Sequence, residues 1–401
     1  MVLAVLVLAV LAWWFDAVFA ERHGFFDLKV YYGAINYWVH GHGELYDYLK
    51  PRSKYGFTYP PFAAFTMTPM ALVPWPVAIV ISVVATTLAT LFVLDRFVAP
   101  VARRYRGNRW FWLAVTACFV AVFEPMRETM LFGQVNMLLV ALVAVDLLML
   151  LPRGSRFTGV GIGLATAVKL TPGIFIVYLA ITRRWRAALV ASVTTGIATL
   201  ATAAVAPDTA REFWTDALWD TDRVGSLAFV SNQSLEGFVA RLDPADPSRV
   251  LWLALVVAVF ALWVWRVRRT AAAGDEFAGL ALTGVVGCLL SPVTWVHHLV
   301  WVLPALLLVA DRGLAATGRR RWWLLGFAAA TYVLLSSRLV WRYNWHFGGW
   351  AVLGSNAYVY ASLALLLALP VQPAGVPPEH GAEASGDVER APVEGRLAVG
   401  G

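Results

Sequence analysis

Charged residues are scarce in this chain of 401 residues. Asp, Glu, Lys and Arg together make up 14% of it, whereas hydrophobic residues make up 60%. So little charge excludes a soluble domain. Repeated apolar runs close to the roughly 20 residues that a spanning helix needs indicate an integral membrane protein. We therefore expect an all-α polytopic membrane protein.

Cysteine is almost absent, and so are the marks of a secretory leader. Cys118 and Cys288 both lie inside apolar runs, so they predict neither a disulfide framework nor a metal cluster. We expect them to be small core or lipid-facing residues. The first 20 residues have no basic start and no A-x-A cleavage site, so we interpret them as a membrane span.

The basic residues gather in five short links between apolar runs. The net charge of +7 could suggest a nucleic-acid partner, but this clustering is the pattern of cytoplasmic loops in membrane proteins. We therefore expect no nucleic acid among the partners and place all five links in the cytoplasm. Their arginines are Arg103, Arg104, Arg106 and Arg109; Arg153 and Arg156; Arg183, Arg184 and Arg186; Arg266, Arg268 and Arg269; and Arg312, Arg319, Arg320 and Arg321.

The apolar runs between these links predict the membrane spans. With two proline-interrupted segments added, we expect about 10–12 transmembrane helices and a cytoplasmic N-terminus. The simple spans lie near residues 2–20, 76–98, 110–124, 131–151, 187–206, 249–265, 276–291, 294–310, 322–337 and 354–370.

Proline interrupts two further segments. The stretch between Arg156 and Arg183 is broken at KLTPG, residues 169–173. We interpret it as two half-helices that return to the same side, which puts Lys169 deep in the membrane. The stretch 61–75 is too short and too rich in proline for a full span, and we interpret it as re-entrant or half-crossing.

The C-terminal residues 371–401 are rich in Pro, Gly, Ala and Glu. Such a composition cannot bury a core, so we expect a disordered cytoplasmic tail. Residues 1–370 then form the transmembrane domain.

In this topology, the polar residues that are costly near a bilayer gather on the outer face. Because charged groups close to lipid are usually functional, we expect these separated segments to converge on one extracytoplasmic cavity. They are the external loops 21–60 and 207–248, the segments 124–136 and 336–350, and the histidines at 297–298.

Asp27 stands at the outer end of the first span, directly before the amphipathic stretch LKVYYGAINYWV. Apolar residues at helical spacing in this stretch predict an interfacial helix. We interpret Asp27 as a catalytic base, because a carboxylate at the membrane surface is well placed to deprotonate a hydroxyl group. The alternative is that it caps the helix.

His297 and His298 begin an apolar helix in SPVTWVHHLVW. Adjacent residues of a helix point about 100° apart, so only one of the two faces the cavity squarely, and we slightly favour His298. Its near-neutral pKa suits a partner for a phosphate leaving group or for a carboxylate base. A purely structural role is the alternative.

Four cations lie at or within the bilayer, where an unpaired charge is costly. An anionic ligand such as a phosphate would account for them, although Arg127 could equally pair with a nearby carboxylate, and aromatic belts at the membrane interface could explain the surroundings of Arg338 and Arg342. The four candidates are Arg127, Lys169, Arg338 and Arg342; the carboxylates near Arg127 are Glu124, Glu128 and Asp27.

Two short motifs resemble metal sites, DTD at 220–222 and HGH at 40–42. The first has no nucleotide-binding domain around it, and the second has no further ligands at a fixed spacing. We therefore expect no metal site and no organic cofactor, and leave a divalent-metal requirement open.

The chain resembles glycosyltransferase family 87, within the GT-C class, through motifs that follow one another in order. These are FFDLKVYYGA with GELYD, FTYPPFAA, FGQVNMLLVAL, AVKLTPGIFIVYL with RRWRA, SNQSL and SPVTWVHHLVW, over most of residues 1–350. The family's members are actinobacterial mannosyltransferases. They take mannose from polyprenyl-phosphomannose and add it, mostly in α-1,2 linkage, to phosphatidylinositol mannosides or lipomannan-type acceptors.

This resemblance implies a multi-pass enzyme of the plasma membrane whose active site faces the extracytoplasmic side. Asp27 matches the family's catalytic base, and the histidine pair matches the family's histidine near the donor phosphate. A β-linked sugar phosphate that yields an α-glycoside requires inversion, which needs one base and no covalent intermediate. Further polar residues expected to contact sugar or acceptor are Tyr59, Gln134, Asn136, Asn232 and Gln233.

Two other functions fit the composition. A transporter or flippase for lipid-linked sugars would also need a cavity with cations, but its pseudo-symmetric halves are not evident here. A GT-C enzyme that transfers another sugar is the second alternative, because composition and spacing do not reveal which hydroxyl groups of the sugar the protein recognises.

Overall fold

The structure is a computed structural model that describes residues 1–19, 23–220, 223 and 225–372. Within these residues the secondary structure is helical, and the β contact is a single antiparallel bridge between Leu49 and Gly56. The prediction of an all-α polytopic membrane protein is confirmed. Nearly all of the expected tail 371–401 lies outside the described residues, as do positions 221 and 222 of the DTD motif.

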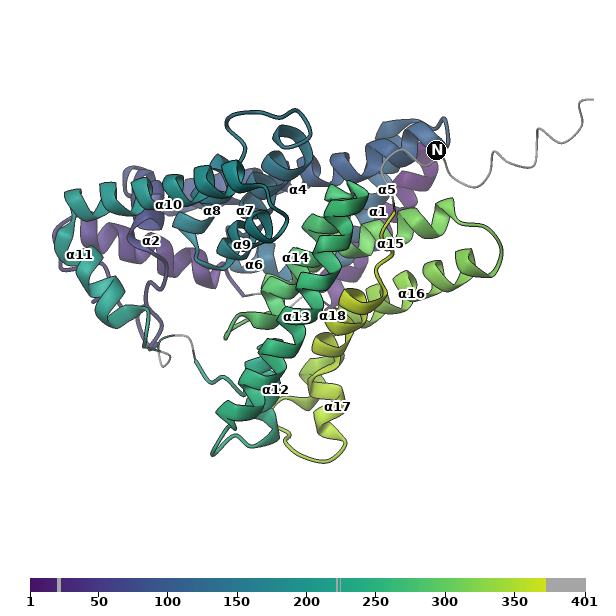
Figure 1. Ribbon diagram of the computed structural model, residues 1–401. Coiled ribbons are helices and arrows are strands. Elements are labelled where there is room, and N and C mark those ends of the chain that lie inside the picture. Colours follow the sequence, from purple (N-terminus) through teal and green to yellow (C-terminus); the bar gives the residue numbers. More distant parts are fainter. Residues whose placement is uncertain (20–22, 221–222, 224, 373–401) are drawn as a thin grey trace, which may run out of the picture.

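The helices follow one another along the chain with short connections (Figure 1). They are α1 (Val2–Phe19), α2 (Phe26–Val39), α3 (Pro61–Met67), η1 (Thr68–Leu72), α4 (Trp75–Arg104), α5 (Arg109–Val122), α6 (Glu124–Phe132), α7 (Asn136–Ala144), η2 (Val145–Leu150), α8 (Val160–Val168), η3 (Thr171–Gly173), α9 (Ile174–Ile181), α10 (Trp185–Val205), α11 (Pro207–Glu212), η4 (Phe213–Ala217), α12 (Leu235–Leu242), α13 (Arg249–Ala273), α14 (Glu276–Leu290), η6 (Val296–Val302), α15 (Leu303–Ala315), α16 (Gly318–Ser336), η7 (Leu339–Tyr343), α17 (Ala351–Ser355) and α18 (Ala357–Ala368).

A helix, or two consecutive helices, lies at each simple span that the sequence predicts, but the number of 10–12 transmembrane helices stays a prediction. In the described part of the chain, four are long and apolar enough to cross a membrane by themselves: α4, α10, α13 and the continuous pair η6 and α15. The pair α5 and α6 qualifies together but is bent by 75°. Shorter apolar helices of 10–17 residues cover the predicted spans near 2–20, 131–151, 276–291 and 354–370.

The predicted break at KLTPG is present. Helix α8 ends at Val168, Lys169 is extended with φ −149° and ψ 128°, and the chain resumes as η3 and α9. Proline is tolerated in the first turn of a helix, where its missing N–H has no partner to lose, so Pro172 favours the start of η3 after the break. The stretch 61–75 likewise forms only the short elements α3 and η1.

Two groups of apolar side chains form the core. The larger unites α4, α7, α14, α15 and α18. The smaller joins α2, the loop 45–59, α3 and η4, so the two external loops expected from the sequence pack against each other. Phe213 lies 5.7 Å from Tyr46 between ring centroids, and Arg223 donates a hydrogen bond to the Tyr46 carbonyl at 2.6 Å. In Figure 1, α2 and α11 accordingly lie close together at one end of the molecule.

The five basic links lie beside one another. Each link contacts a neighbouring link, or residues directly beside it, through an arginine side chain. Such contacts are expected if all five links lie on the same side of the membrane. Arg104 pairs with Asp311 at 2.7 Å, Arg312 with Asp275 at 2.5 Å, Arg184 with Glu276, and Arg186 donates to the Gly154 carbonyl at 2.9 Å.

Candidate active site

Helix α2 holds Asp27 against α6. The helix starts after Phe25, which has the left-handed φ of 57° and donates its backbone N–H to the Leu131 carbonyl at 2.9 Å. Phe25 is therefore the N-cap residue, and Asp27 lies within the first turn instead of capping it. Where α6 ends, Gly133 adopts φ 72°, and this turn delivers Gln134 to the carboxylate of Asp27.

Asp27 begins a chain of side-chain hydrogen bonds. Gln134 Nε2 donates to Asp27 Oδ2 at 2.5 Å, and Tyr59 donates its hydroxyl proton to Gln134 Oε1 at 2.9 Å. Desolvation raises the pKa of Asp27 to about 6, against the opposing hydrogen bond from Gln134. A carboxyl group with this pKa is ionised at neutral pH and is more basic than an exposed aspartate, as general-base catalysis favours.

Tyr59 joins the carboxylate to the buried amino group of Lys169. Its hydroxyl oxygen accepts from Tyr31 at 2.8 Å and from Lys169 Nζ at 3.2 Å, so its own proton is directed to Gln134. Burial also raises the pKa of Tyr59 above its ordinary value, which keeps this proton in place. Asp27 and Lys169 are therefore linked through two neutral side chains.

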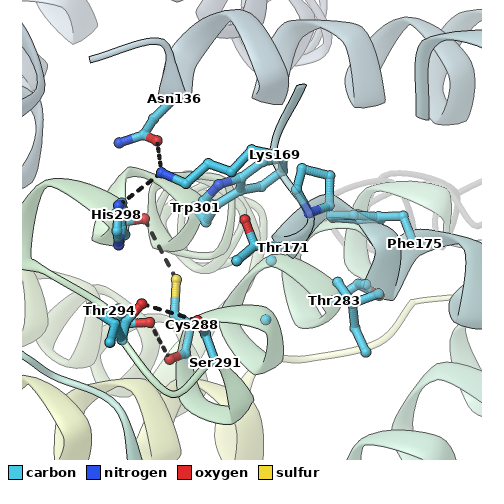
Figure 2. A pocket seen from close by; sticks show the side chains of 15 residues that line it. Asn136, Lys169, Thr171, Phe175, Thr283, Cys288, Ser291, Thr294, His298 and Trp301 are labelled. Atoms are coloured by element: carbon cyan, nitrogen blue, oxygen red, sulfur yellow. Dashed lines mark hydrogen bonds between the residues drawn. The ribbon is translucent and has the colours of Figure 1, made fainter. Parts of the chain in front are cut away.

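Lys169 also contacts the segment that bears the histidines. Its Nζ lies 3.1 Å from Asn136 Oδ1 and 2.9 Å from His298 Nε2 (Figure 2). Asn136 donates to the His297 carbonyl at 3.1 Å, and Thr129 donates to the same oxygen at 2.8 Å. Helices α6 and α7 thus fix the peptide between the two histidines.

Of the two histidines, His298 points into the site. Its Nε2 meets Lys169, whereas the His297 ring packs against Phe132 at 5.2 Å between ring centroids. That His298 and not His297 acts on the donor phosphate stays a prediction.

A small, partly open cleft adjoins Lys169 and His298. Figure 2 shows both side chains at the cleft, with Thr171 from the KLTPG break, Phe175 from α9 and Cys288 from α14 around them. Both nitrogen atoms, Lys169 Nζ and His298 Nε2, belong to residues that line this cleft. Trp301, which packs on Phe175 at 5.4 Å, adds an aromatic surface.

The three arginine candidates lie outside this hydrogen-bonded network. Arg127 is buried, pairs with Asp16 at 3.5 Å, and stacks over Phe15 at 5.1 Å, so its carboxylate partner comes from α1. Arg338 stacks over Trp341 at 5.8 Å, and Arg342 is exposed in η7.

Asn232 and Gln233 are fully buried, and their amides bind backbone atoms. Asn232 accepts from the Thr294 N–H at 2.9 Å and donates to the Pro292 carbonyl at 3.2 Å. Gln233 donates to the Ser355 carbonyl at 2.8 Å. The bonds of Asn232 hold the SPVTW segment that leads to His298, whereas the side chain of Gln233 holds the junction of α17 and α18.

Several residues at the site escape sequence reasoning. Tyr31 fits the apolar stripe of α2, and Thr129 lies in an unremarkable helix turn, yet both complete the network. Glu124 is fully buried and accepts from Trp341 Nε1 at 2.5 Å and from the Tyr358 hydroxyl, which ties η7 and α18 to α6. A buried carboxylate in an apolar chain is the signal that could have singled out Glu124.

Of the two weak metal motifs, HGH at 40–42 is described in full, whereas only Asp220 of DTD is described. In the described residues, no group of three or more His, Cys, Asp or Glu side chains is placed to hold a metal ion. His40 contacts the Asn36 carbonyl at 2.9 Å, and Asp220 pairs with Arg223 at 2.9 Å.

Comparison with known proteins identifies relatives of the chain. The profile of glycosyltransferase family 87 matches residues 57–292. A polyprenol-phosphate-mannose-dependent alpha-(1-2)-phosphatidylinositol mannoside mannosyltransferase of Mycobacterium tuberculosis is 33% identical over 336 residues, which cover 78% of this chain and 75% of the relative. A polyprenol-phosphate-mannose-dependent alpha-(1-2)-phosphatidylinositol pentamannoside mannosyltransferase of Mycolicibacterium smegmatis is 32% identical over 396 residues, covering 91% and 89%. No solved structure matches the chain.

Proposed function

The chain belongs to glycosyltransferase family 87, and we propose that it transfers mannose from polyprenyl-phosphomannose to a phosphatidylinositol mannoside or a lipomannan-type acceptor in α-1,2 linkage. The names of both relatives support this donor and this linkage. Because those names differ in the acceptor, the length of the mannoside chain stays outside the proposal.

One observation carries the proposed mechanism: a carboxylate and a cation–histidine pair face each other through a single hydrogen-bonded network. Asp27 accepts the proton of the acceptor hydroxyl as that oxygen attacks the anomeric carbon. The bond from this carbon to the phosphate oxygen breaks on the opposite face, and its electron pair stays with the phosphate. One displacement inverts the anomeric configuration, as a β-linked donor and an α-linked product require.

Lys169 and His298 bind the departing phosphate in this proposal. Negative charge on the phosphate grows as the glycosidic bond breaks, and oriented donors stabilise it most strongly in the transition state. Both residues line the partly open cleft, which is where we place the phosphate of the donor. Phosphate leaves readily once its charge is stabilised, so a separate general acid is unnecessary.

We place this site at the extracytoplasmic face of the plasma membrane, within a transmembrane domain of residues 1–370. The clustering of the basic links supports this orientation, because such links flank spans on the cytoplasmic side. The polar segments of the network are separate from these links in the chain.

The test is transfer by the purified protein in lipid nanodiscs. Polyprenyl-phosphomannose is supplied with phosphatidylinositol mannosides of increasing size, and the product is identified by mass spectrometry, with its linkage assigned by NMR. Parallel reactions contain polyprenyl-phosphoglucose or GDP-mannose as donor.

We expect one added α-1,2-mannose from the lipid-linked mannose donor alone. Transfer from GDP-mannose, or preferential transfer of glucose, would contradict the proposed donor. Movement of the donor across sealed vesicles without any transfer would identify a transporter.

A further inference from the structure

The hydrogen bonds of His298 determine which of its ring nitrogens carries a proton. The backbone N–H of Trp295 donates to His298 Nδ1 at 3.1 Å, and a backbone amide has no lone pair with which to accept in return. Nδ1 is therefore unprotonated, which excludes the imidazolium form and places the proton of the neutral ring on Nε2. Turning the ring over would put carbon atoms at both contact positions.

The opposite tautomer would leave a donor without its acceptor. A proton on Nδ1 would be directed to the nearby Val293 carbonyl, and the Trp295 N–H would then face another N–H group. The tautomer with its proton on Nε2 satisfies the Trp295 contact.

This tautomer restricts the charge of Lys169. Nζ of Lys169 lies 2.9 Å from His298 Nε2, so the Nε2–H must donate and Nζ must accept. An ammonium group has three donors and no lone pair, whereas a neutral amine has two donors and one lone pair. The other two contacts of Nζ, with Tyr59 and Asn136, use those two donors.

We infer that Lys169 is a neutral amine in the empty site and takes up a proton when the phosphate of the donor binds. This inference rests on the proposed function, because it requires a phosphodiester in the cleft beside Lys169. In the occupied site, the phosphate oxygens accept from His298 Nε2–H and from the new ammonium group. The charge of Lys169 thus appears together with the anion that it binds.

The groups around Lys169 are consistent with a neutral resting state. Its direct contacts on three elements are the uncharged Tyr59, Asn136 and His298. Other titratable groups that face it are Asp27 on α2, Cys288 on α14 and His297 on η6. Asp27 is reached only through Tyr59 and Gln134, so the resting site avoids burying an unpaired ammonium.

The experiment measures donor binding as a function of pH. Polyprenyl-phosphomannose, which is a phosphodiester without a titrating proton near neutrality, is added without acceptor to the Asp27→Asn protein in nanodiscs, and its dissociation constant is determined calorimetrically. Uptake of one proton raises this constant about tenfold per pH unit from pH 7.5 to 8.5. Buffers of different ionisation enthalpy give the proton count directly, with an expected value close to one.

Lys169→Arg is the matched variant, because arginine keeps its charge throughout this range. Its donor affinity should be independent of pH, and its proton uptake should vanish. His297→Asn tests whether the second histidine takes part in the proton uptake. The dissociation constant of this variant should depend on pH as steeply as that of the parent protein.

Failure of this inference differs from failure of the proposed function. If the donor binds with an affinity that is independent of pH and without proton uptake, Lys169 is not neutral in the empty site. The proposed phosphate-binding site is unaffected by that result. If the dissociation constant of Lys169→Arg depends on pH as steeply as that of the parent protein, another group takes up the proton. That result also overturns the inference of a neutral lysine. No donor binding at any pH overturns both.

Discussion

At the scale of single residues, Asp27 carries the clearest prediction. Asp27→Asn should lower the turnover number of mannosyl transfer by about 10²–10⁴, because a general base typically contributes that much. Asparagine keeps an oxygen that can accept from Gln134, so the fold should persist. Initial rates and thermal unfolding are compared with Asp47→Asn, an exposed carboxylate of the same external loop, which should leave the rate unchanged. Joint loss of folding and activity in Asp27→Asn would point to a structural role.

The raised pKa of Asp27 predicts how transfer depends on pH. With a pKa of about 6, the base is protonated in acid, so kcat/KM should fall about tenfold per pH unit below that value. The hydrogen bond from Gln134 lowers this pKa, so Gln134→Leu should move the acid limb to higher pH. If kcat/KM of Gln134→Leu instead falls at the same pH as in the parent protein, or at a lower pH, the assignment of the titrating base to Asp27 is contradicted.

The same group makes folding stability depend on pH. Because the folded protein holds the Asp27 proton more tightly than the unfolded chain, this stabilisation is complete below about pH 3.8 and is lost as the pH rises through about 6. Asp27→Asn removes the buried charge. Its unfolding temperature, relative to the parent protein, should therefore rise more at pH 7.5 than at pH 5.

The polar residues of the site could be predicted from the sequence better than their hydrogen-bond partners. A charge in an apolar chain is costly wherever it lies, so Asp27, Lys169 and the histidines could be singled out without coordinates. Their partners could not, because the bond from Tyr59 to Gln134 joins positions 75 residues apart. Buried amides are ambiguous for the same reason: Gln233 has the expected polarity, but its contacts are with backbone atoms.

At the scale of elements, the turn after α6 sets the position of α2. Gly133 has φ 72°, and a Cβ added there would lie 2.6 Å from Leu28 Cβ. Gly133→Ala should therefore push α2 away and lower both transfer activity and unfolding temperature. Gly41→Ala is a matched control, because Gly41 has the same φ of 72° but nothing within 4 Å of the added atom.

The Gly41→Ala control distinguishes the effect of the steric clash with Leu28 from the effect of backbone strain. Both variants have an alanine in the left-handed region, which costs roughly 1–2 kcal/mol. Only Gly133→Ala adds a clash beside Asp27, so its activity should fall well below that of Gly41→Ala. Equal effects in the two variants would mean that the packing of Leu28 on the turn does not position the base.

Helix breaks were more predictable than helix contacts. The proline in KLTPG favours the first turn of a new helix, and the sequence therefore locates the break between α8 and η3. The start of α2 at Phe26 depends instead on the left-handed Phe25 and its bond to Leu131, which only the folded chain supplies. Likewise, the shared wall of α6 and η6 around His297 follows from packing and not from periodicity.

At the scale of the whole molecule, the separation of basic links from polar segments determines orientation. The links are joined by contacts such as that of Arg104 with Asp311, and the segments of the site by bonds such as that of Gln134 with Asp27. Positive charge flanking spans is retained in the cytoplasm, so the proposed site should face the opposite compartment.

Cysteine labelling tests this orientation. After Cys118 and Cys288 are replaced by alanine, single cysteines are introduced at exposed positions, and intact cells are treated with an impermeant maleimide. Arg52→Cys, Asp246→Cys and Trp350→Cys should be labelled from outside, whereas Arg153→Cys and Arg319→Cys should react only after the membrane is permeabilised.

Exposure matters to this design, because a buried thiol would remain unlabelled on either side. All five positions are exposed in the structure, so full labelling after permeabilisation serves as an internal control for each variant. Labelling of Arg319→Cys from outside, with protection of Arg52→Cys, would invert the orientation and place Asp27 and Lys169 at the cytoplasmic face. Soluble nucleotide sugars would then have direct access to the cleft, and the choice of a lipid-linked donor would lose its topological support.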